Sequence, residues 1–211
     1  VDMKKQNSPQ VRQEIITRRV MEQGWVSVDD LVDTLGVSRM TVHRDLDELE
    51  DAGVLRKVRN GASVQPSSLF ESDYRYRVTQ QSAEKRAICE KAASLIEPGT
   101  SIMMDDSTTV LPLAEFFNEI ESLTVITHFL PVIQQLANQR NIRLITLGGE
   151  YLPRFETFTG ILCQQAIASL RADACFLSAA ACVAGEVFHP ETELIHMKCS
   201  MMRQCTRKYL L

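Results

Sequence analysis

The sequence predicts a mixed α/β protein with two domains, and two observations support this prediction. Between residues 27 and 53, two short amphipathic helices are separated by a tight turn, and a basic segment follows them. From residue 82 onward, helices alternate with short apolar strands, which is typical of a Rossmann-like, mostly parallel sheet covered on both faces. We therefore expect a winged helix-turn-helix domain at 1–64, a linker at 65–81 and an α/β domain at 82–211.

Serines and glycines mark the ends of the two short helices. Ser27 and Ser38 can cap them, because a serine hydroxyl accepts a hydrogen bond from the free N–H groups of a first helical turn. Gly36 can close the first helix in the left-handed conformation, and Gly53 stands where the second should end. A turn this short makes the helices cross steeply, as in a helix-turn-helix.

A further helix is expected before this pair. Apolar residues recur at helical spacing from Val11 to Val20 and form the face that should pack on the other two helices. We expect Arg12, Arg18 and Arg19 to lie on its solvent-exposed side.

The second helix of the pair has a polar face opposite its apolar one, and a basic hairpin follows it. Asn60-Gly61 between two extended segments is a strong hairpin signal, so this segment should form a wing beside the helix. Polar and basic side chains on such a helix and wing contact base edges and phosphates of DNA. The alternative is a small helical domain with an ordinary solvated face. The candidate DNA-binding residues are Ser38, Arg39, Met40, Thr41, His43, Arg44, Arg56, Lys57 and Arg59.

Two stretches carry a resemblance to a known family. The segments S-R-M-T-V-H-R-D-L-D-E-L-E and G-V-L-R-K-V-R-N-G-A resemble the winged helix-turn-helix of the DeoR family of bacterial transcription regulators. The family usually has arginine at the position of His43 and Gly-Gly at Asn60-Gly61. The resemblance implies a double-stranded DNA operator as a partner, and the change at His43 leaves the preferred bases open.

Charge and cysteine content limit the other classes of function. The net charge of the 211 residues is −4, and residues 1–64 hold ten Lys and Arg against eleven Asp and Glu, so DNA binding must depend on local basic residues. We expect Asp29, Asp30 and Asp33 to face away from DNA. The six cysteines lack metal-ligand spacing, so a metal site is not indicated. We expect no cofactor. Without an evident signal peptide or membrane span, a cytoplasmic protein is expected, nucleoid-associated when bound to DNA.

The linker leads into the α/β domain. Tyr74, Arg75, Tyr76 and Arg77 could form a nucleic-acid stacking patch, but a connector that packs against both domains is the preferred interpretation. In the second domain we expect strands at 102–104, 123–127, 142–147 and 174–179. Helices are expected at 83–96, from Thr109 to about Asn118, at 130–137 and at 161–170, and Lys208 to Leu211 read as the start of another strand.

Ligands of an open parallel sheet bind at the carboxyl ends of its strands, where helix N-termini offer N–H groups to anions. Three strand ends carry suitable residues, namely 105–109, 148–150 and 159–160. Each is also explained by helix caps or tight turns. Together they favour a site for an anionic small molecule, to which Arg154 could add charge.

Residues 84–211 resemble the sensor domain of the DeoR family, which is similar to ribose-5-phosphate isomerase and binds phosphorylated sugars. Its D-x-G-T-T motif matches 105–109 with Ser107 in place of glycine, and His128 and Ala180 replace a usual asparagine and acidic residue. Family members continue beyond the position of Leu211, so either a shortened chain or an omitted remainder is possible. The candidate effector-binding residues are Asp105, Ser107, Thr108, Thr109, His128, Gly148, Gly149, Glu150, Arg154, Gly160, Glu193 and Lys198.

The preferred function is a repressor of a carbohydrate catabolic operon that responds to a phosphorylated sugar and forms a homodimer or homotetramer. One alternative is an isomerase-like enzyme with a helical accessory module, which is disfavoured because Ala180 cannot act as an acid or base. Another is a DNA-binding fragment that no longer senses a ligand. We expect no catalytic residue, and we place a phosphate near 107–109 or near Gly148 and Gly149, with Lys198 as counter-charge.

Overall fold

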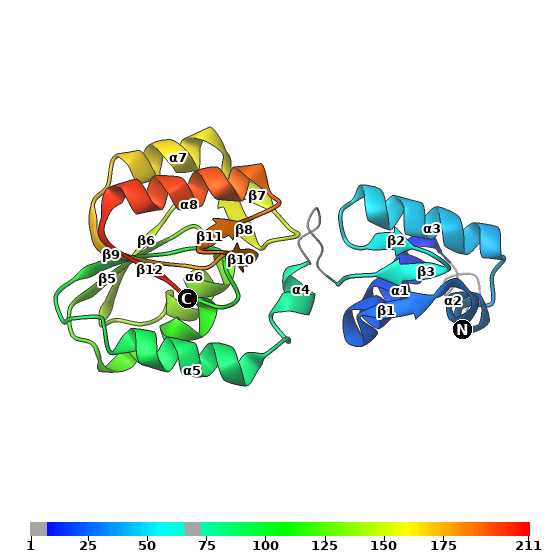
Figure 1. Ribbon diagram of the computed structural model, residues 1–211, viewed down its shortest axis with the longest axis horizontal. Helices are drawn as coiled ribbons and strands as arrows, with labels where there is room; N and C mark the ends of the chain where they lie inside the picture. Colours follow the sequence, from blue (N-terminus) through cyan, green and yellow to red (C-terminus); the bar gives the residue numbers. More distant parts are fainter. Residues whose placement is uncertain (1–7, 66–72) are drawn as a thin grey trace. The chain divides into compact units, whose positions relative to one another are not determined.

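The computed structural model describes residues 8–65 and 73–211 (Figure 1). It has the expected mixed α/β architecture and divides into two compact units, one ending at Thr79 and the other beginning at Gln80. Most of the expected linker, 66–72, lies outside the described residues, whereas residues 73–79 belong to the first unit. Within this part Asp73 caps a short helix, and Tyr76 packs against the apolar core of the first unit.

The first unit is a helical domain with a small sheet. The strands pair antiparallel in the order β1-β3-β2. Its elements are α1 (Pro9–Gln23), β1 (Trp25–Ser27), α2 (Val28–Leu35), α3 (Arg39–Asp51), β2 (Arg56–Val58), β3 (Gly61–Ser63) and α4 (Tyr74–Arg77).

The expected caps form in the first unit. Ser27 Oγ accepts a hydrogen bond from Asp30 N at 3.0 Å, and Ser38 Oγ accepts one from Thr41 N at 3.2 Å. Gly36 ends α2 with a φ of 62°, in the left-handed region where a side chain is disfavoured. These residues fix where α2 and α3 begin and where α2 ends.

Two local expectations for this unit need correction. Arg12 does not lie on the solvent-exposed side of α1, because it is 5% exposed and pairs with the buried Asp45 of α3. The hairpin turn consists of Arg59 and Asn60, with Asn60 at a φ of 59°. Gly61 instead begins β3, where a Cβ atom would lie 2.3 Å from the carbonyl oxygen of Val26. Glycine is therefore required there by the close approach of β1.

The second unit is built on a parallel sheet of five strands in the order β12-β9-β4-β5-β6. Two antiparallel hairpins, β7–β8 and β10–β11, complete its strands. Its elements are α5 (Ser82–Ala93), β4 (Ser101–Met104), the 3₁₀ helix η1 (Leu111–Glu119), β5 (Leu123–Thr127), α6 (Leu130–Leu136), β6 (Ile142–Thr146), β7 (Glu150–Leu152), β8 (Thr157–Thr159), α7 (Gly160–Ala168), β9 (Ala172–Leu177), β10 (Ala181–Val183), β11 (Glu186–Phe188), α8 (Thr192–Gln204) and β12 (Cys205–Leu210).

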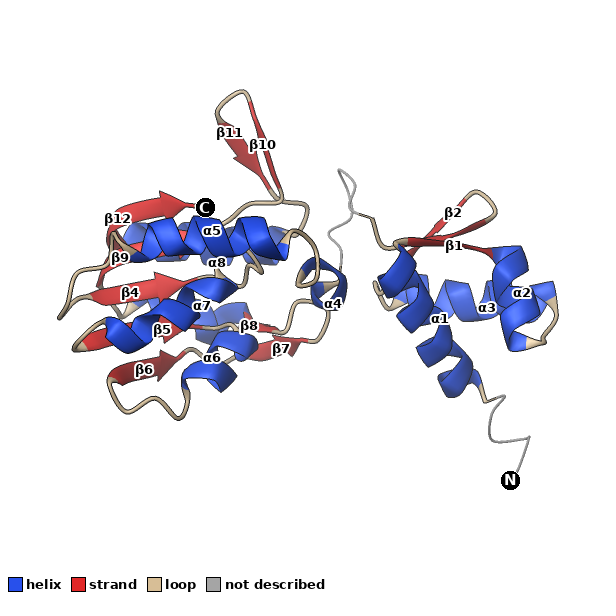
Figure 2. Cartoon of the chain, turned by 90° about the horizontal axis from the view of Figure 1, so that it is seen from below, coloured by secondary structure: helices blue, strands red, loops and turns tan. Residues whose placement is uncertain are grey.

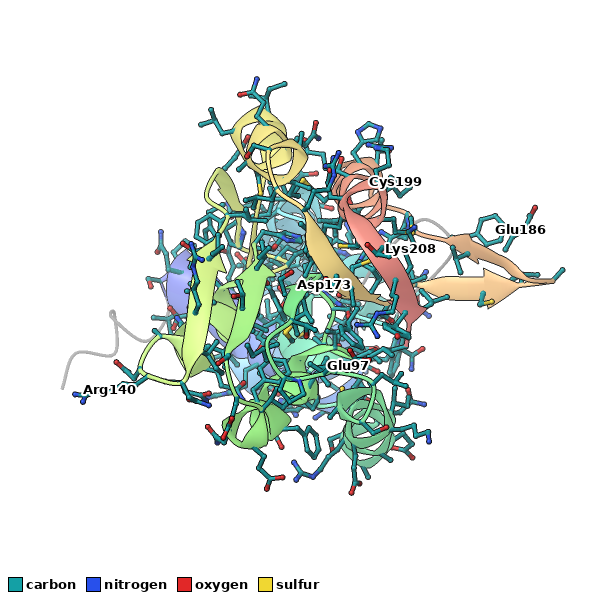
Figure 3. The ribbon with its side chains drawn as sticks, turned by 90° about the vertical axis from the view of Figure 1, so that its left-hand side faces the viewer. Glu97, Arg140, Asp173, Glu186, Cys199 and Lys208 are labelled. Carbon is teal, nitrogen blue, oxygen red and sulfur yellow. The ribbon has the colours of Figure 1, made fainter. Side chains whose placement is uncertain are left out.

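Helices cover both faces of this sheet. Helices α7 and α8 lie on one face, and α5 and α6 lie on the other (Figures 1 and 2). The 3₁₀ helix η1 contacts both α5 and α6. Side chains alternate accordingly: Met103 and Cys175 belong to the core beneath α7 and α8, whereas their buried neighbours Ile102 and Phe176 point to the opposite face. The hairpin β10–β11 projects from the unit, with Glu186 on β11 (Figure 3).

The expected elements of the second unit are present, with one change in helix type. The segment after Thr109 is not an α-helix, because a turn at 108–110 leads into η1. At the start of this segment Val110 N donates to the carbonyl oxygen of Ser107, three residues earlier, which is the bond spacing of a 3₁₀ helix. The last segment forms the edge strand β12. None of the helices in the described ranges, 8–65 and 73–211, is long and apolar enough to span a membrane.

Candidate functional site

Helix α3 presents a polar face to solvent. Its buried side chains, Val42, Asp45, Leu46 and Leu49, lie on the opposite face. Met40 is 81% exposed. Arg39 and Arg44 are exposed, and Thr41 and His43 are half-buried. Ser38 caps the helix and lies 2.9 Å from Thr41 Oγ1, so these two hydroxyls are held at the start of α3.

The wing supplies the remaining candidate cations. Arg59 is exposed in the turn between β2 and β3, and Arg56 Nε donates to the carbonyl oxygen of Gln65 at 3.3 Å. Lys57 lies on β2, where its backbone N–H donates to the carboxylate of Glu50 at 2.6 Å. This bond ties the wing to α3.

Carboxylates of α3 also tie the helix to α1. Asp45 accepts two hydrogen bonds from Arg12, at 2.7 and 2.9 Å, in a buried pair. Glu48 accepts one from Gln13 at 2.5 Å. Together with Glu50, these contacts fix α3 between α1 and the wing. The exposed face of α3 is therefore held in a defined orientation.

Two of the candidate DNA-binding cations are paired with carboxylates. Arg39 pairs with Asp29 of α2, and Lys57 pairs with Asp47 of α3. Asp29 thus does not face away from the candidate surface as expected, since its carboxylate contacts the first residue of α3. Asp30 instead bonds the Ser27 hydroxyl at 2.7 Å.

In the second unit, charged residues gather at the carboxyl ends of β4 and β5. Lys198 Nζ of α8 donates to Asp105 Oδ2 at 2.6 Å and to Asp106 Oδ1 at 3.0 Å. Asp105 also accepts backbone hydrogen bonds from Ser107 at 3.1 Å and Ser178 at 2.9 Å. We call Asp105, Asp106 and Lys198 the triad. It joins β4, the start of the loop after β9, and α8.

Asp106 and Lys198 of the triad stabilise each other's charged forms. Burial alone would raise the pKa of Asp106, but the charge of Lys198 outweighs burial and lowers that pKa. Burial likewise opposes the charge of Lys198, yet the two carboxylates raise its pKa. Two carboxylates facing one ammonium group leave one net negative charge.

His128 lies beside the triad in a polar but unsatisfied position. It is fully buried, and neither ring nitrogen has a hydrogen-bond partner within the described part of the chain. Its Nε2 atom is 3.8 Å from Asp106 Oδ1, beyond hydrogen-bond reach. A buried imidazole ring whose nitrogens lack hydrogen-bond partners is costly, which sets His128 apart from the paired residues around it.

Residues 107–109, which follow Asp106 in the chain, lie next to α5. Lys85 Nζ of α5 donates to Thr108 Oγ1 at 3.1 Å. Ser107 Oγ accepts from Val110 N at 3.2 Å, while Thr109 is half-buried beside them. Of the expected effector residues, Asp105, Ser107, Thr108, His128 and Lys198 are thus brought together.

The other expected effector residues lie around β7, β8 and the start of α7. A Cβ atom on Gly149 would lie 2.2 Å from the carbonyl oxygen of Thr159, and Gly160 has a φ of 86°. The local backbone therefore explains why both positions are glycine. A Cβ atom on Gly148 would meet nothing within 4 Å. Thr159 Oγ1 donates to Glu193 at 3.1 Å.

Two further candidates make contacts away from the triad. Arg154 pairs with Glu191 at 3.1 Å and lies over the ring of Phe155, 5.0 Å from its centroid. Glu150 is exposed on β7, where it pairs in register with Thr159.

Comparisons with known proteins identify the family. Residues 12–68 match the DeoR-like helix-turn-helix domain, and residues 80–211 match the DeoR C terminal sensor domain. The chain belongs to the DeoR family. This family consists of transcription regulators, so the expectation of a DNA-binding regulator rather than an enzyme is confirmed.

Two relatives align with most of this DeoR-family chain. The lactose phosphotransferase system repressor of Staphylococcus aureus is 35% identical over 199 residues, which cover 93% of this chain and 79% of the relative. The HTH-type transcriptional regulator YgbI of Escherichia coli is 31% identical over 190 residues, covering 90% and 74%. The sorbitol operon regulator SorC from Klebsiella pneumoniae, a solved structure, has 12% identity and a TM-score of 0.33 over 86% of this chain and 70% of its own, too low to carry an argument.

Two residues of this DeoR-family sensor domain were missed by sequence reasoning. Asp106 was visible as the second residue of an Asp-Asp pair, but only the structure shows that both carboxylates share Lys198. Lys85 had no signal, because a lysine in the first turns of a helix is ordinarily solvated. Its contact with Thr108 joins positions 23 residues apart.

Proposed function

We propose that the protein is a repressor that binds a double-stranded operator through α3 and the wing and responds to a phosphorylated sugar bound by the second unit. The observation that carries the DNA-binding part is the exposed face of α3. Arg39, His43 and Arg44 lie opposite its buried apolar side chains, and the helix is anchored on both sides. Such a helix fits a major groove, and side chains near its N-terminus reach base edges.

The sensor part follows from the chemistry at the carboxyl edge of the sheet. Because Asp105 and Asp106 already pair with Lys198, we place the phosphate away from that lysine. We place the hydroxyl groups of the sugar beside the triad and His128, where carboxylates accept and the ammonium group donates. Glu193 can accept a further hydroxyl. The phosphate is placed near Thr108 and Thr109, where Lys85 supplies positive charge.

The names of the relatives support a sugar-related effector. The Staphylococcus aureus relative is called a lactose phosphotransferase system repressor. A phosphorylated sugar would bind one conformation of the second unit better than another, and DNA affinity would change by that difference. We also propose a cytoplasmic, two-fold oligomer, dimer or tetramer, because a single winged module buries little surface on DNA.

The effector is tested by titration calorimetry with a panel of aldose and ketose phosphates, each matched with its unphosphorylated sugar. We expect a binder that requires the phosphate, loses affinity in Lys85→Ala and Thr108→Ala, and binds normally to Lys91→Ala, an exposed lysine on the same helix. Binding of the plain sugar with equal affinity would contradict the phosphate assignment. A binder unaffected by both substitutions would show that the site lies elsewhere.

A further inference from the structure

Two carboxylates are built into the proposed DNA-binding surface. Asp29 pairs with Arg39 at the start of α3, and Asp47 pairs with Lys57 in the wing. Both pairs connect different elements, α2 with α3 and α3 with β2. The inference below rests on the proposed function, because it concerns how these cations meet DNA.

Stability does not explain the two pairs. The side chains of Arg39 and Asp29 are 57% and 72% exposed, and those of Lys57 and Asp47 are 29% and 57% exposed. Exposed ion pairs contribute little to folding, because solvent screens the charges and holding two long side chains in place costs entropy. The wing is in any case anchored by the bond from Lys57 N to Glu50, which does not involve Asp47.

The pairs matter more for the balance between phosphate and base contacts. Attraction of free cations to phosphates is independent of sequence and supplies nearly all non-specific binding. A carboxylate beside a cation weakens that attraction, and it also holds the side chain in one direction. Fixed direction favours a bond to a base edge, which requires defined geometry. The near balance of positive and negative charge over residues 1–64 fits the same pattern.

We propose that Asp29 and Asp47 are specificity-determining residues, which suppress phosphate-driven binding by Arg39 and Lys57 and position these side chains for one DNA sequence. The two carboxylates would not read bases themselves. They act through the cations they hold, so their loss should change discrimination between sequences more than affinity for the operator.

The experiment compares charge-neutralising variants of the full chain. Asp29→Asn and Asp47→Asn remove a paired carboxylate. Asp33→Asn and Asp51→Asn remove the same charge from the same two helices, at exposed positions that form no ion pair with any described residue. Two probes are used, a duplex selected by the wild-type protein from a random library and a scrambled duplex of equal length. Each is titrated by fluorescence anisotropy across a series of salt concentrations.

We expect Asp29→Asn and Asp47→Asn each to bind the scrambled duplex about two- to five-fold more tightly, with little change on the selected duplex. The slope of log affinity against log salt on the scrambled duplex should steepen by about 0.9 for each released cation. Equal tightening on both duplexes, or changes no larger than those of Asp33→Asn and Asp51→Asn, would overturn the inference. If the wild-type protein selects no sequence at all, the proposed DNA recognition is wrong and the inference falls with it.

Discussion

At the residue scale, the second unit depends on charges that compensate one another in a buried site. Lys198 is 8% exposed, and Asp105 and Asp106 are 0% and 2% exposed. Groups so buried are tolerated when their partners are fully in place. The triad therefore couples strand β4 to helix α8. A ligand that forms hydrogen bonds with the triad's oxygen atoms would affect the positions of both elements.

Replacing Lys198 with methionine should strongly destabilise the second unit, because two carboxylates would remain buried without their cation. We expect a loss of about 3–5 kcal/mol in the free energy of unfolding. Urea denaturation of Lys198→Met against Lys208→Met, an exposed lysine on β12, measures this. Stability equal to wild type would show that the triad does not hold the unit together.

Stability should also fall in acid through Asp106. The pKa of Asp106 is lowered in the folded state, so its contribution is present above the unfolded value of about 3.9 and is lost as the pH falls toward the folded pKa. Thermal melts of wild type and Asp106→Asn between pH 6 and pH 3 test this. The variant should lose less stability than wild type over that range; parallel curves would contradict the lowered pKa.

At the element scale, sequence patterns predicted most of the secondary structure, because caps and periodicity are local. Ser27, Gly36 and Ser38 act as their positions indicate. Helical periodicity wrongly placed Arg12 on the solvent-exposed side of α1, because its partner Asp45 lies 33 positions away. It also failed to show why residue 61 is glycine, since the reason is the approach of a different strand. Lys85 and Asp106 escaped notice in the candidate site for the same reason: their contacts are long-range.

The pair of Arg12 and Asp45 should be the strongest polar link between α1 and α3. Breaking it in Arg12→Ala leaves a buried carboxylate without its cation, so we expect a loss of about 3–5 kcal/mol in the stability of the first unit. Arg18→Ala, an exposed arginine on the same helix, is the matched control. Chemical denaturation followed by the fluorescence of Trp25 gives the comparison. Equal midpoints for the two variants would refute this role.

At the scale of the whole molecule, the chain combines a DNA-reading unit with no excess of positive charge and a sensor unit whose buried triad holds two carboxylates against one ammonium group. Net charge therefore cannot bring it to DNA, and binding must depend on a few oriented side chains. The amino-acid composition already indicated that DNA binding depends on local basic residues. The sequence could not show that Arg39 and Lys57 are themselves paired, because their partners belong to other elements.

The most direct test of the account is the affinity of Arg44→Ala for the duplex that the wild-type protein selects from a random library. Arg44 is exposed on the polar face of α3, so its loss should cost about 1–3 kcal/mol of binding free energy and relax the selected sequence at one position. Lys91→Ala, an exposed lysine of the second unit, should bind like wild type. Binding of Arg44→Ala with wild-type affinity and sequence preference would contradict the assignment of α3 as the recognition helix.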